Sequence, residues 1–221
     1  DMKYDILLFD LDGTLADTIR GVMDSARYAL AFYGIYPTEQ ELKPFFGPPL
    51  MYSFTTLFGL NEQRAAEAIT RYREKYDEIG IEESCLYEGM ADILDELRSV
   101  GYRLGVATSK YELYAQYMLK THGIADRFEY ICGSNKDESI SKKHQIIGLA
   151  LEKFGYTDKR DKVLMIGDLK YDILGAHTAG IDAMGVYTGS AAEGEHEKAG
   201  AEYVAHSHKE MCEILLKMAK D

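Results

Sequence analysis

The sequence is poor in cysteine and contains no long hydrophobic run. Its three cysteines, Cys85, Cys132 and Cys212, are far apart in 221 residues and form no Cys-x-x-Cys pair or Cys/His ligand spacing. This pattern favours free thiols in a reducing compartment over a disulfide framework or a zinc site. No apolar run approaches the roughly 18 residues of a membrane helix, and no signal-peptide pattern is present. We therefore expect a cytoplasmic protein without a membrane partner.

Positive charge is also scarce, because 25 Lys and Arg face 37 Asp and Glu and give a formal net charge of −12. A nucleic-acid binder needs a basic face for the phosphate backbone, so we expect no nucleic-acid partner. A small anionic substrate remains compatible, since a bound divalent cation and one or two lysines would reverse the charge locally. The composition, 46% apolar, is typical of a globular protein, and internal repeats are absent.

Short apolar segments that stop at polar or glycine-containing clusters predict strands. The expected strands are Tyr4–Phe9, Arg103–Ala107, Phe128–Cys132, Val163–Ile166, Ala183–Tyr187 and Tyr203–Ala205. Helical patterns between them cover Met90–Val100, Glu112–Thr121 and Lys143–Phe154. This alternation predicts an α/β fold with a doubly wound, Rossmann-like parallel sheet. Ligands of such sheets bind beyond the carboxyl ends of the strands, so the polar clusters that follow the strands are candidate site residues.

One interval between strands is too long for a simple crossover. A strand–helix–strand unit takes roughly 30 residues, whereas nearly a hundred residues separate Asp10 from Thr108. Helical patterns in the surplus are Thr18–Tyr33, a short segment opened by a Thr38-x-x-Glu41 capping box, a segment after Pro49, and Glu62–Glu78. We expect residues 17–87 to form a small helical cap domain, inserted into an α/β core domain made of residues 1–16 and 88–221.

The strongest chemical signal is Asp10-Leu11-Asp12-Gly13-Thr14, at the end of the first expected strand. Two carboxylates one residue apart can divide the work: one acts as a nucleophile, and the other donates and accepts a proton. Gly13 lets the backbone turn closely around an oxyanion. A solvated acidic turn would explain an Asp-x-Asp pair alone, but it does not explain the pair at the end of a buried strand followed by Gly-Thr.

A second acidic cluster follows the fourth expected strand at Asp168 and Asp172. Carboxylates that converge on one point repel each other unless a cation joins them, and Mg²⁺ prefers oxygen ligands. We expect Asp168 to be a direct ligand and Asp172 to bind through water or to brace the other ligands. An ordinary helix N-terminus, which also favours acids, is an adequate explanation for Asp172 alone.

Hydroxyl groups and a lysine complete the candidate site. Thr108 and Ser109 follow the second expected strand, where a hydroxyl and a backbone N–H can hold phosphoryl oxygens, although such residues also cap helices. Lys143 opens a helix, where the dipole disfavours a cation, so a lysine there suits a neighbouring anion. The adjacent Lys142 leaves the choice between the two lysines open.

These four clusters, in this order, resemble the motifs of the haloacid dehalogenase superfamily of phosphatases. The matching positions are Asp10–Thr14, Thr108, Lys143 and Gly167-Asp168-x-x-x-Asp172. The third motif departs from many relatives, in which the lysine precedes a proline, because His144 follows Lys143 here.

The resemblance, which is nearest to phosphoglycolate phosphatase and related small-metabolite phosphatases, implies a role for each motif. Asp10 would be the nucleophile and Asp12 the acid/base. Asp10, Asp168 and the Asp12 backbone carbonyl would bind Mg²⁺, and Thr108 and Lys143 would bind the phosphoryl group. The segment containing Phe46, Gly47 and Pro48 resembles the substrate-selecting loop of the family's cap.

These observations predict a Mg²⁺-dependent phosphatase that hydrolyses a small phosphorylated metabolite through a phosphoaspartate. The metabolite would be phosphoglycolate-like, a nucleotide or a sugar phosphate, and the protein a monomer or weak dimer. One alternative is a phosphomutase of the β-phosphoglucomutase type, which would use the same residues. A dehalogenase is disfavoured, because it needs no second acid such as Asp12 to protonate a leaving alkoxide. A catalytically idle binding or regulatory module is disfavoured because all four motifs are intact.

Overall fold

A computed structural model describes residues 1–220 of the chain, and its centre is a parallel sheet. The six strands run in the order β5-β4-β1-β6-β7-β8. Their bounds are Ile6–Phe9 for β1, Arg103–Tyr111 for β4, Tyr130–Ser134 for β5, Val163–Gly167 for β6, Asp182–Val186 for β7 and Tyr203–Ala205 for β8. All five neighbouring pairs are parallel, which confirms the predicted α/β fold with a doubly wound sheet.

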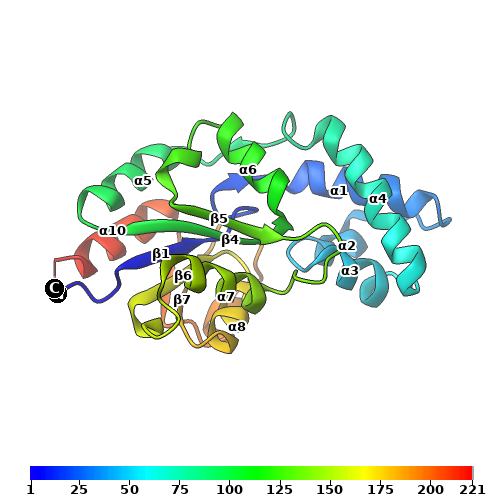
Figure 1. The fold of residues 1–221 in the computed structure, drawn as a ribbon. Coiled ribbons are helices and arrows are strands. Elements are labelled where there is room, and N and C mark those ends of the chain that lie inside the picture. The colour runs from blue at the N-terminus through cyan, green and yellow to red at the C-terminus, as the bar shows by residue number, and fades with distance from the viewer. Residues whose placement is uncertain (221) are drawn as a thin grey trace.

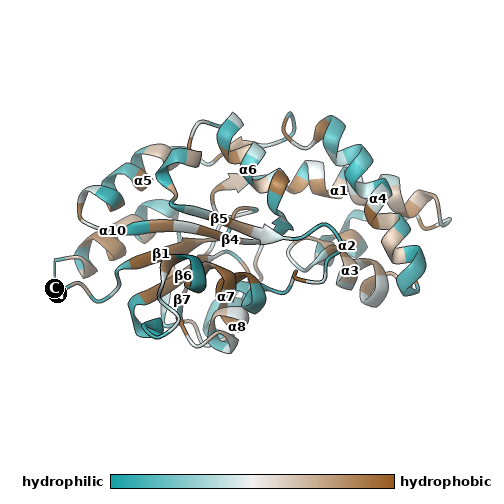
Figure 2. Cartoon of the chain, viewed as in Figure 1, coloured by the Kyte–Doolittle hydropathy of each residue, from teal (hydrophilic) through white to brown (hydrophobic). Residues whose placement is uncertain are grey.

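Helices cover both faces of this sheet (Figure 1). Their bounds are Met90–Ser99 for α5, Glu112–Thr121 for α6, Lys143–Phe154 for α7, Lys170–Thr178 for α8, Glu195–Lys198 for α9 and His208–Met218 for α10. Along β1, Leu7 packs with residues of α5, α6 and α10, whereas Leu8 packs with residues of α7 and α8. Successive side chains of a strand point to opposite faces, so a continuous apolar run is what a sheet covered on both sides requires. Figure 2 shows β1 in brown, the hydrophobic end of the scale.

The order of the strands fixes where a ligand can approach. The chain passes from β1 to β4 and β5 on one side, and then crosses over to β6, β7 and β8 on the other. The direction of winding therefore reverses between β1 and β6, the position at which doubly wound sheets bind their ligands. The β1 strand pairs with β6 from Ile6↔Val163 to Phe9↔Ile166, so Asp10 and Gly167 lie at equivalent depths at its end.

The long segment after β1 folds as helices beyond the carboxyl ends of the strands (Figure 1). The bounds are Ile19–Ala31 for α1, Glu39–Leu42 for α2, Leu50–Tyr52 for α3 and Glu62–Ile79 for α4, with a 3-10 turn at Lys43–Phe45 and a π-helical turn at Ser53–Leu57. The Thr38 side chain and Glu41 form the expected capping box at the start of α2. The helices α1 and α4 agree with the predicted boundaries to within two residues.

A short antiparallel pair of strands marks the two points where the chain enters and leaves this helical segment. The β2 strand (Ala16–Asp17) pairs with β3 (Cys85–Leu86), so that Ala16 faces Leu86 and Asp17 faces Cys85. This pair was not predicted, because two-residue strands leave no periodic pattern. Within residues 1–220, no helix has both the length and the apolar character needed to cross a membrane.

Candidate active site

Asp10 stands at the carboxyl end of β1, directly beside β6. Its backbone N–H continues the strand pairing by donating to the Ile166 carbonyl at 2.9 Å. The side chain is only 8% exposed, and its Oδ1 accepts a hydrogen bond from the Leu11 N–H at 2.8 Å. The sheet therefore holds a nearly buried carboxylate at the point where the strand order reverses.

The loop after Asp10 folds tightly against Asp168, which follows β6. Gly13 has φ +81°, and a Cβ at this position would lie 2.0 Å from Asp168 Oδ2. The Thr14 hydroxyl donates to Asp168 Oδ1 at 3.1 Å, and the Thr188 hydroxyl donates to the Gly13 carbonyl at 2.6 Å. Glycine is required here both for the left-handed backbone and for the space that Asp168 occupies.

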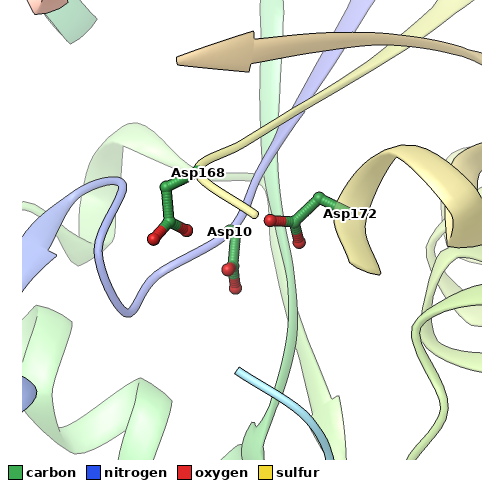
Figure 3. A group of neighbouring side chains, drawn as sticks. All are labelled: Asp10, Asp168 and Asp172. Atoms are coloured by element: carbon green, nitrogen blue, oxygen red, sulfur yellow. The ribbon is translucent and has the colours of Figure 1, made fainter. Parts of the chain in front are cut away.

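Three carboxylates converge at this edge of the sheet. One oxygen each of Asp10, Asp168 and Asp172 lies within 4.8 Å of the other two, and all three residues are buried. Figure 3 shows Asp10, at the end of β1, between Asp168 and Asp172, which both belong to the segment that follows β6. We call these three residues the acidic cluster. Asp172, in the first turn of α8, also accepts a hydrogen bond from the Leu169 N–H at 3.2 Å.

Lys143, the first residue of α7, reaches into the acidic cluster and is 8% exposed. Its Nζ lies 3.1 Å from Asp10 Oδ1 and 3.0 Å from Asp172 Oδ1, and it donates to the Ala107 carbonyl at 2.9 Å. Lys142 is exposed. Of the two lysines that the sequence left open, the structure therefore brings Lys143 to the site.

The charges of the acidic cluster do not balance. Burial, followed by the charge of Asp172, raises the pKa of Asp10 to about 7, although Lys143 opposes this shift. Burial and the two other carboxylates raise the pKa of Asp168 well above its ordinary value. Burial lowers the pKa of Lys143, but Asp10 and Asp172 outweigh it and the net shift is upward. Three carboxyl groups thus share one cation, an arrangement that favours further positive charge.

One atom of the cluster indicates where that charge belongs. Asp168 Oδ2 is buried and has no hydrogen-bond partner. A buried, unpaired carboxylate oxygen is costly, and oxygen atoms of this kind are the ligands that Mg²⁺ prefers. The donor set of Asp10, Asp168 and Asp172 therefore fits a hard divalent cation.

Asp12 points elsewhere. Its Oδ1 accepts a hydrogen bond from the Thr18 hydroxyl at 2.6 Å and lies 3.1 Å from Lys110 Nζ. The Asp12 carboxylate is not part of the acidic cluster, whose members are Asp10, Asp168 and Asp172. Asp10 and Asp12 instead share a cavity, which both of them line. The two acids of the first motif thus share the cavity, but only Asp10 also belongs to the acidic cluster.

The residues after Ala107 lie at the same cavity. The sequence predicted that this strand ends at Ala107, but β4 continues to Tyr111 with an irregular register between Ala107 and Tyr111. An irregularity of this kind re-aims side chains at the end of a strand. Thr108 is buried and accepts a hydrogen bond from the Lys110 N–H at 3.1 Å, and both Thr108 and Ser109 line the cavity.

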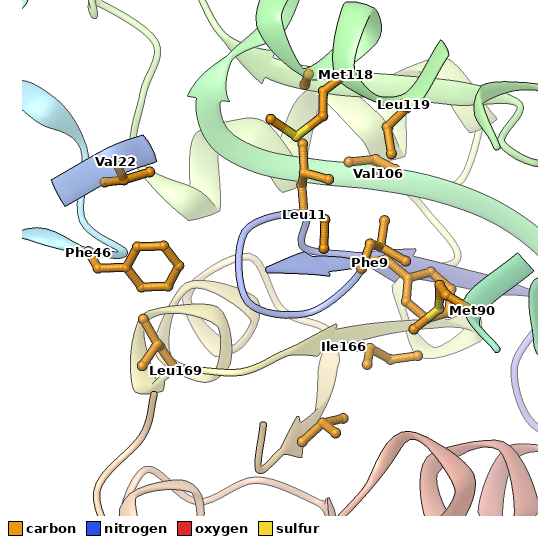
Figure 4. Packing of buried hydrophobic residues seen from close by; sticks show 14 of the residues in the cluster. Phe9, Leu11, Val22, Phe46, Met90, Val106, Met118, Leu119, Ile166 and Leu169 are labelled. Carbon is orange, nitrogen blue, oxygen red and sulfur yellow. The ribbon is translucent and has the colours of Figure 1, made fainter. Parts of the chain in front are cut away.

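The other side of the cavity comes from the helical segment. It is lined there by Val22, Phe45, Phe46, Gly47, Pro48, Leu50, Tyr72 and Arg73. Phe46, Gly47 and Pro48, the expected substrate-selecting loop, therefore face Asp10 and Asp12 across the cavity. A Cβ at Gly47 would lie 2.5 Å from Leu169 Cδ1, so this loop also touches the residue after Asp168. Figure 4 shows Phe46 and Val22 near Leu169.

Two contacts of residues that line the cavity, Lys110 and Tyr72, were missed from the sequence. Lys110 Nζ donates to the Tyr76 hydroxyl at 2.6 Å, besides its contact with Asp12. The rings of Tyr72 and Tyr76, one helical turn apart on α4, stack with centroids 5.6 Å apart. The position of Lys110 next to Thr108 and Ser109, and the four-residue spacing of the two tyrosines, were the available signals.

The chain is similar to a known family model and to proteins of known sequence and structure. Residues 7–186 match the family model described as haloacid dehalogenase-like hydrolase. A 5'-nucleotidase of Pseudomonas aeruginosa is 36% identical over 195 residues, covering 88% of this chain and 87% of that protein. The tyrosine-protein kinase PtkA of Mycobacterium tuberculosis is 36% identical over 202 residues, covering 91% of this chain and 68% of that protein. The crystal structure of a predicted phosphatase from Clostridium acetobutylicum has a TM-score of 0.92 at 35% identity and covers 97% of this chain and 99% of its own.

Proposed function

The chain belongs to the haloacid dehalogenase-like hydrolase family and is a phosphoric monoester hydrolase; from this premise we propose that it is a Mg²⁺-dependent phosphatase of small phosphorylated metabolites that works through a phosphoaspartate. The observation that carries the proposal is the placement of Asp10. Its buried carboxylate lies 3.1 Å from Lys143 Nζ and lines a cavity with Asp12. A nucleophile and an acid/base that line one cavity suit a two-step transfer.

The proposed chemistry assigns a role to each residue of this site. An oxygen of Asp10 attacks phosphorus, the bond from phosphorus to the leaving oxygen breaks, and Asp12 donates a proton to that oxygen. Asp12 then removes a proton from water, which attacks the phosphoaspartate, and the bond between phosphorus and Asp10 breaks to release inorganic phosphate. Lys143 and Thr108 would hold the phosphoryl oxygens. Asp10 and Asp168, with Asp172 beside them, would hold Mg²⁺, which supplies positive charge next to the reacting carboxylate.

We also propose the division of labour between two domains. Residues 1–16 and 88–221 would form the catalytic core, and residues 17–87 a cap that closes over the substrate and excludes water. The contacts of Phe46–Pro48 with the cavity support this role for the cap. We also propose that the protein is a monomer or weak dimer.

The experiment is an assay of phosphate release with p-nitrophenyl phosphate and with a panel of metabolites. The panel contains phosphoglycolate, nucleoside monophosphates and sugar phosphates, including β-glucose 1-phosphate, whose isomerisation would reveal a mutase. Activity should require Mg²⁺ and should be inhibited by Ca²⁺, whose larger and looser coordination spoils the compact geometry. Full turnover in excess EDTA would refute the metal dependence.

Two variants separate the proposed metal ligands. Asp168→Ala should raise the Mg²⁺ concentration needed for half-maximal activity far more than Asp172→Ala does. The reason is that Asp168 Oδ2 is buried and unpaired, whereas both oxygens of Asp172 have partners in Lys143 and the Leu169 N–H. Wild-type metal dependence in Asp168→Ala would show that the ligand is misassigned.

A further inference from the structure

Arg73 is a cation on the cavity wall whose donors are only partly used. It lies on α4 and lines the cavity that contains Asp10 and Asp12. Its Nη1 donates to the Lys136 carbonyl at 2.7 Å, and the guanidinium lies over the Tyr111 ring, 4.4 Å from the centroid. Its Nε and Nη2 are buried and have no hydrogen-bond partner. The guanidinium is therefore fixed through Nη1, whereas the N–H groups of Nε and Nη2 lack acceptors.

The side chain as a whole is half-buried, but two buried N–H groups without partners are costly, and the guanidinium cannot avoid this cost by losing its proton. Nε–H and Nη2–H share one edge of the group and form a planar fork. This fork matches two oxygens of a carboxylate or a phosphate group. Within residues 1–220, the other cation that lines the cavity is Lys110, which is already placed 3.1 Å from Asp12 and donates to Tyr76. Lys143 likewise already forms ion pairs with Asp10 and Asp172.

We propose that Arg73 binds a second anionic group of the substrate, separate from the phosphoryl group that is transferred to Asp10. This inference rests on the proposed phosphatase function and specifies the class of substrate. Preferred substrates carry a carboxylate or a second phosphate on the leaving group, whereas esters of neutral alcohols are poor substrates. The specificity comes from the desolvated fork, because a substrate without an anion leaves the two donors unpaired.

The carboxylate of Glu138 is a rival partner for Arg73: burial raises the pKa of Glu138, and the charge of the neighbouring Arg73 opposes this shift. Glu138 is buried, with φ +62°, and its Oε1 accepts a hydrogen bond from the Met51 N–H at 3.3 Å. Its Oε2, like the Arg73 fork, is buried without a hydrogen-bond partner. If the fork served only to pair with Glu138, its loss would affect the stability of the protein and leave the choice of substrate unchanged. Substrate binding by Arg73 therefore predicts a change in substrate preference, whereas pairing with Glu138 predicts a change in stability alone.

The test compares Arg73→Gln with wild type on matched pairs of substrates. One pair is phosphoglycolate and 2-hydroxyethyl phosphate, which differ by a carboxylate in place of a hydroxymethyl group. The other is propane-1,3-diol bisphosphate and 3-hydroxypropyl phosphate. Loss of a charged, bidentate contact should lower kcat/KM for the anionic member by about 10- to 100-fold. The neutral member should change by less than about threefold.

Arg71→Gln is the matched control, because Arg71 lies on the same helix but is exposed and pairs with Glu74 at 3.5 Å. It should alter neither member of either pair. If kcat/KM falls only for phosphoglycolate, the second anion is a carboxylate. If it falls only for the bisphosphate, the second anion is a phosphate. If it falls for both, the fork accepts either oxyanion.

Equal losses on both members of each pair, or no loss at all, would overturn the role of Arg73. So would a wild-type enzyme that hydrolyses the neutral esters as well as the anionic ones. A lower melting temperature of Arg73→Gln and Glu138→Gln with unchanged preference would assign the fork to Glu138. Hydrolysis of p-nitrophenyl phosphate by the wild type tests the phosphatase function separately, so failure of one proposal does not imply failure of the other.

Discussion

The acidic cluster and the cap-side wall of the cavity are built in different ways. Asp10 and Asp168 follow strand ends of one sheet directly, and Asp172 is held in the first turn of the next helix. Neighbouring strands fix their separation, and Lys143 ties Asp10 to Asp172. The cap-side wall, with Phe46, Tyr72 and Arg73, belongs to the helical segment, which is joined to the sheet through the two-residue strands β2 and β3.

This difference indicates which part of the reaction each region controls. Residues on a continuous sheet keep their geometry, which suits the steps in which bonds form and break. Residues on an inserted helical segment can move as a unit, which suits admission of the substrate and recognition of its leaving group. We therefore expect variants of the acidic cluster and its neighbours to reduce the chemical step. Variants of the cap-side wall should mainly change the choice and the binding of substrates.

The largest effect should come from Asp10→Asn, which removes the nucleophile while keeping the side-chain shape. We expect almost no turnover with any phosphate ester, whatever its leaving group. Rapid quench with a radiolabelled ester measures the intermediate, and acid-stable label should appear on wild type and be absent from Asp10→Asn. Label retained by the variant, or mapped to another residue, would contradict the proposed nucleophile.

Asp12→Ala should be severely impaired but not inactive, since loss of general acid–base catalysis typically costs about 10²–10⁴-fold in rate. Asp12 faces the cavity beside Lys110 and is not part of the acidic cluster, so its loss should leave metal binding intact. A substrate with a good leaving group needs less protonation, and p-nitrophenyl phosphate should recover part of the activity. A rate loss that is the same for good and poor leaving groups would argue against the acid role of Asp12.

The acidic cluster also predicts how stability depends on pH. The pKa of Asp10 in the folded protein is about 7, above its ordinary value of 3.8, because of burial and the neighbouring Asp172. The folded state therefore binds more protons than the unfolded state between about pH 4 and pH 7, and the metal-free protein should lose stability as the pH rises through this window. Mg²⁺ should reduce this loss, since it favours the ionised carboxylates.

Melting temperatures measured across this window, in EDTA and in Mg²⁺, would show the effect. Asp168→Asn should weaken the dependence in EDTA, because it removes one of the mutually repelling carboxylates. The exposed Asp158 provides a control, and Asp158→Asn should leave the dependence unchanged. Identical pH profiles in EDTA and Mg²⁺ would contradict the metal site.

The sheet and the approximate positions of the acids could be predicted from the sequence, because strand ends are encoded locally. The run Ile6–Phe9 followed by Asp10 specifies both a buried strand and the edge at which the acid stands. The contact between Lys110 and Tyr76 could not be predicted, because it depends on how α4 lies against the end of β4. The sequence motif also does not predict that the Asp12 side chain points away from the acidic cluster. That orientation follows from the tight turn at Gly13 and from the hydrogen bond with the Thr18 hydroxyl.

The smallest effect, and the one that addresses the cap-side wall directly, should come from Gly47→Ala. Gly47 has φ +116°, and a Cβ there would lie 2.5 Å from Leu169 Cδ1. The substitution therefore combines backbone strain, typically about 1–3 kcal/mol, with a clash between the cap loop and the residue that follows Asp168. We expect the loop to shift, KM to rise by about 3- to 30-fold, and the Mg²⁺ requirement to stay as in wild type.

Gly59→Ala is the control, since Gly59 also has a positive φ, +74°, but nothing lies within 4 Å of the added Cβ. It should lower the melting temperature through strain without raising KM. A rise in KM for both variants would show that strain in the helical segment, and not the contact of Gly47 with the core, governs substrate binding.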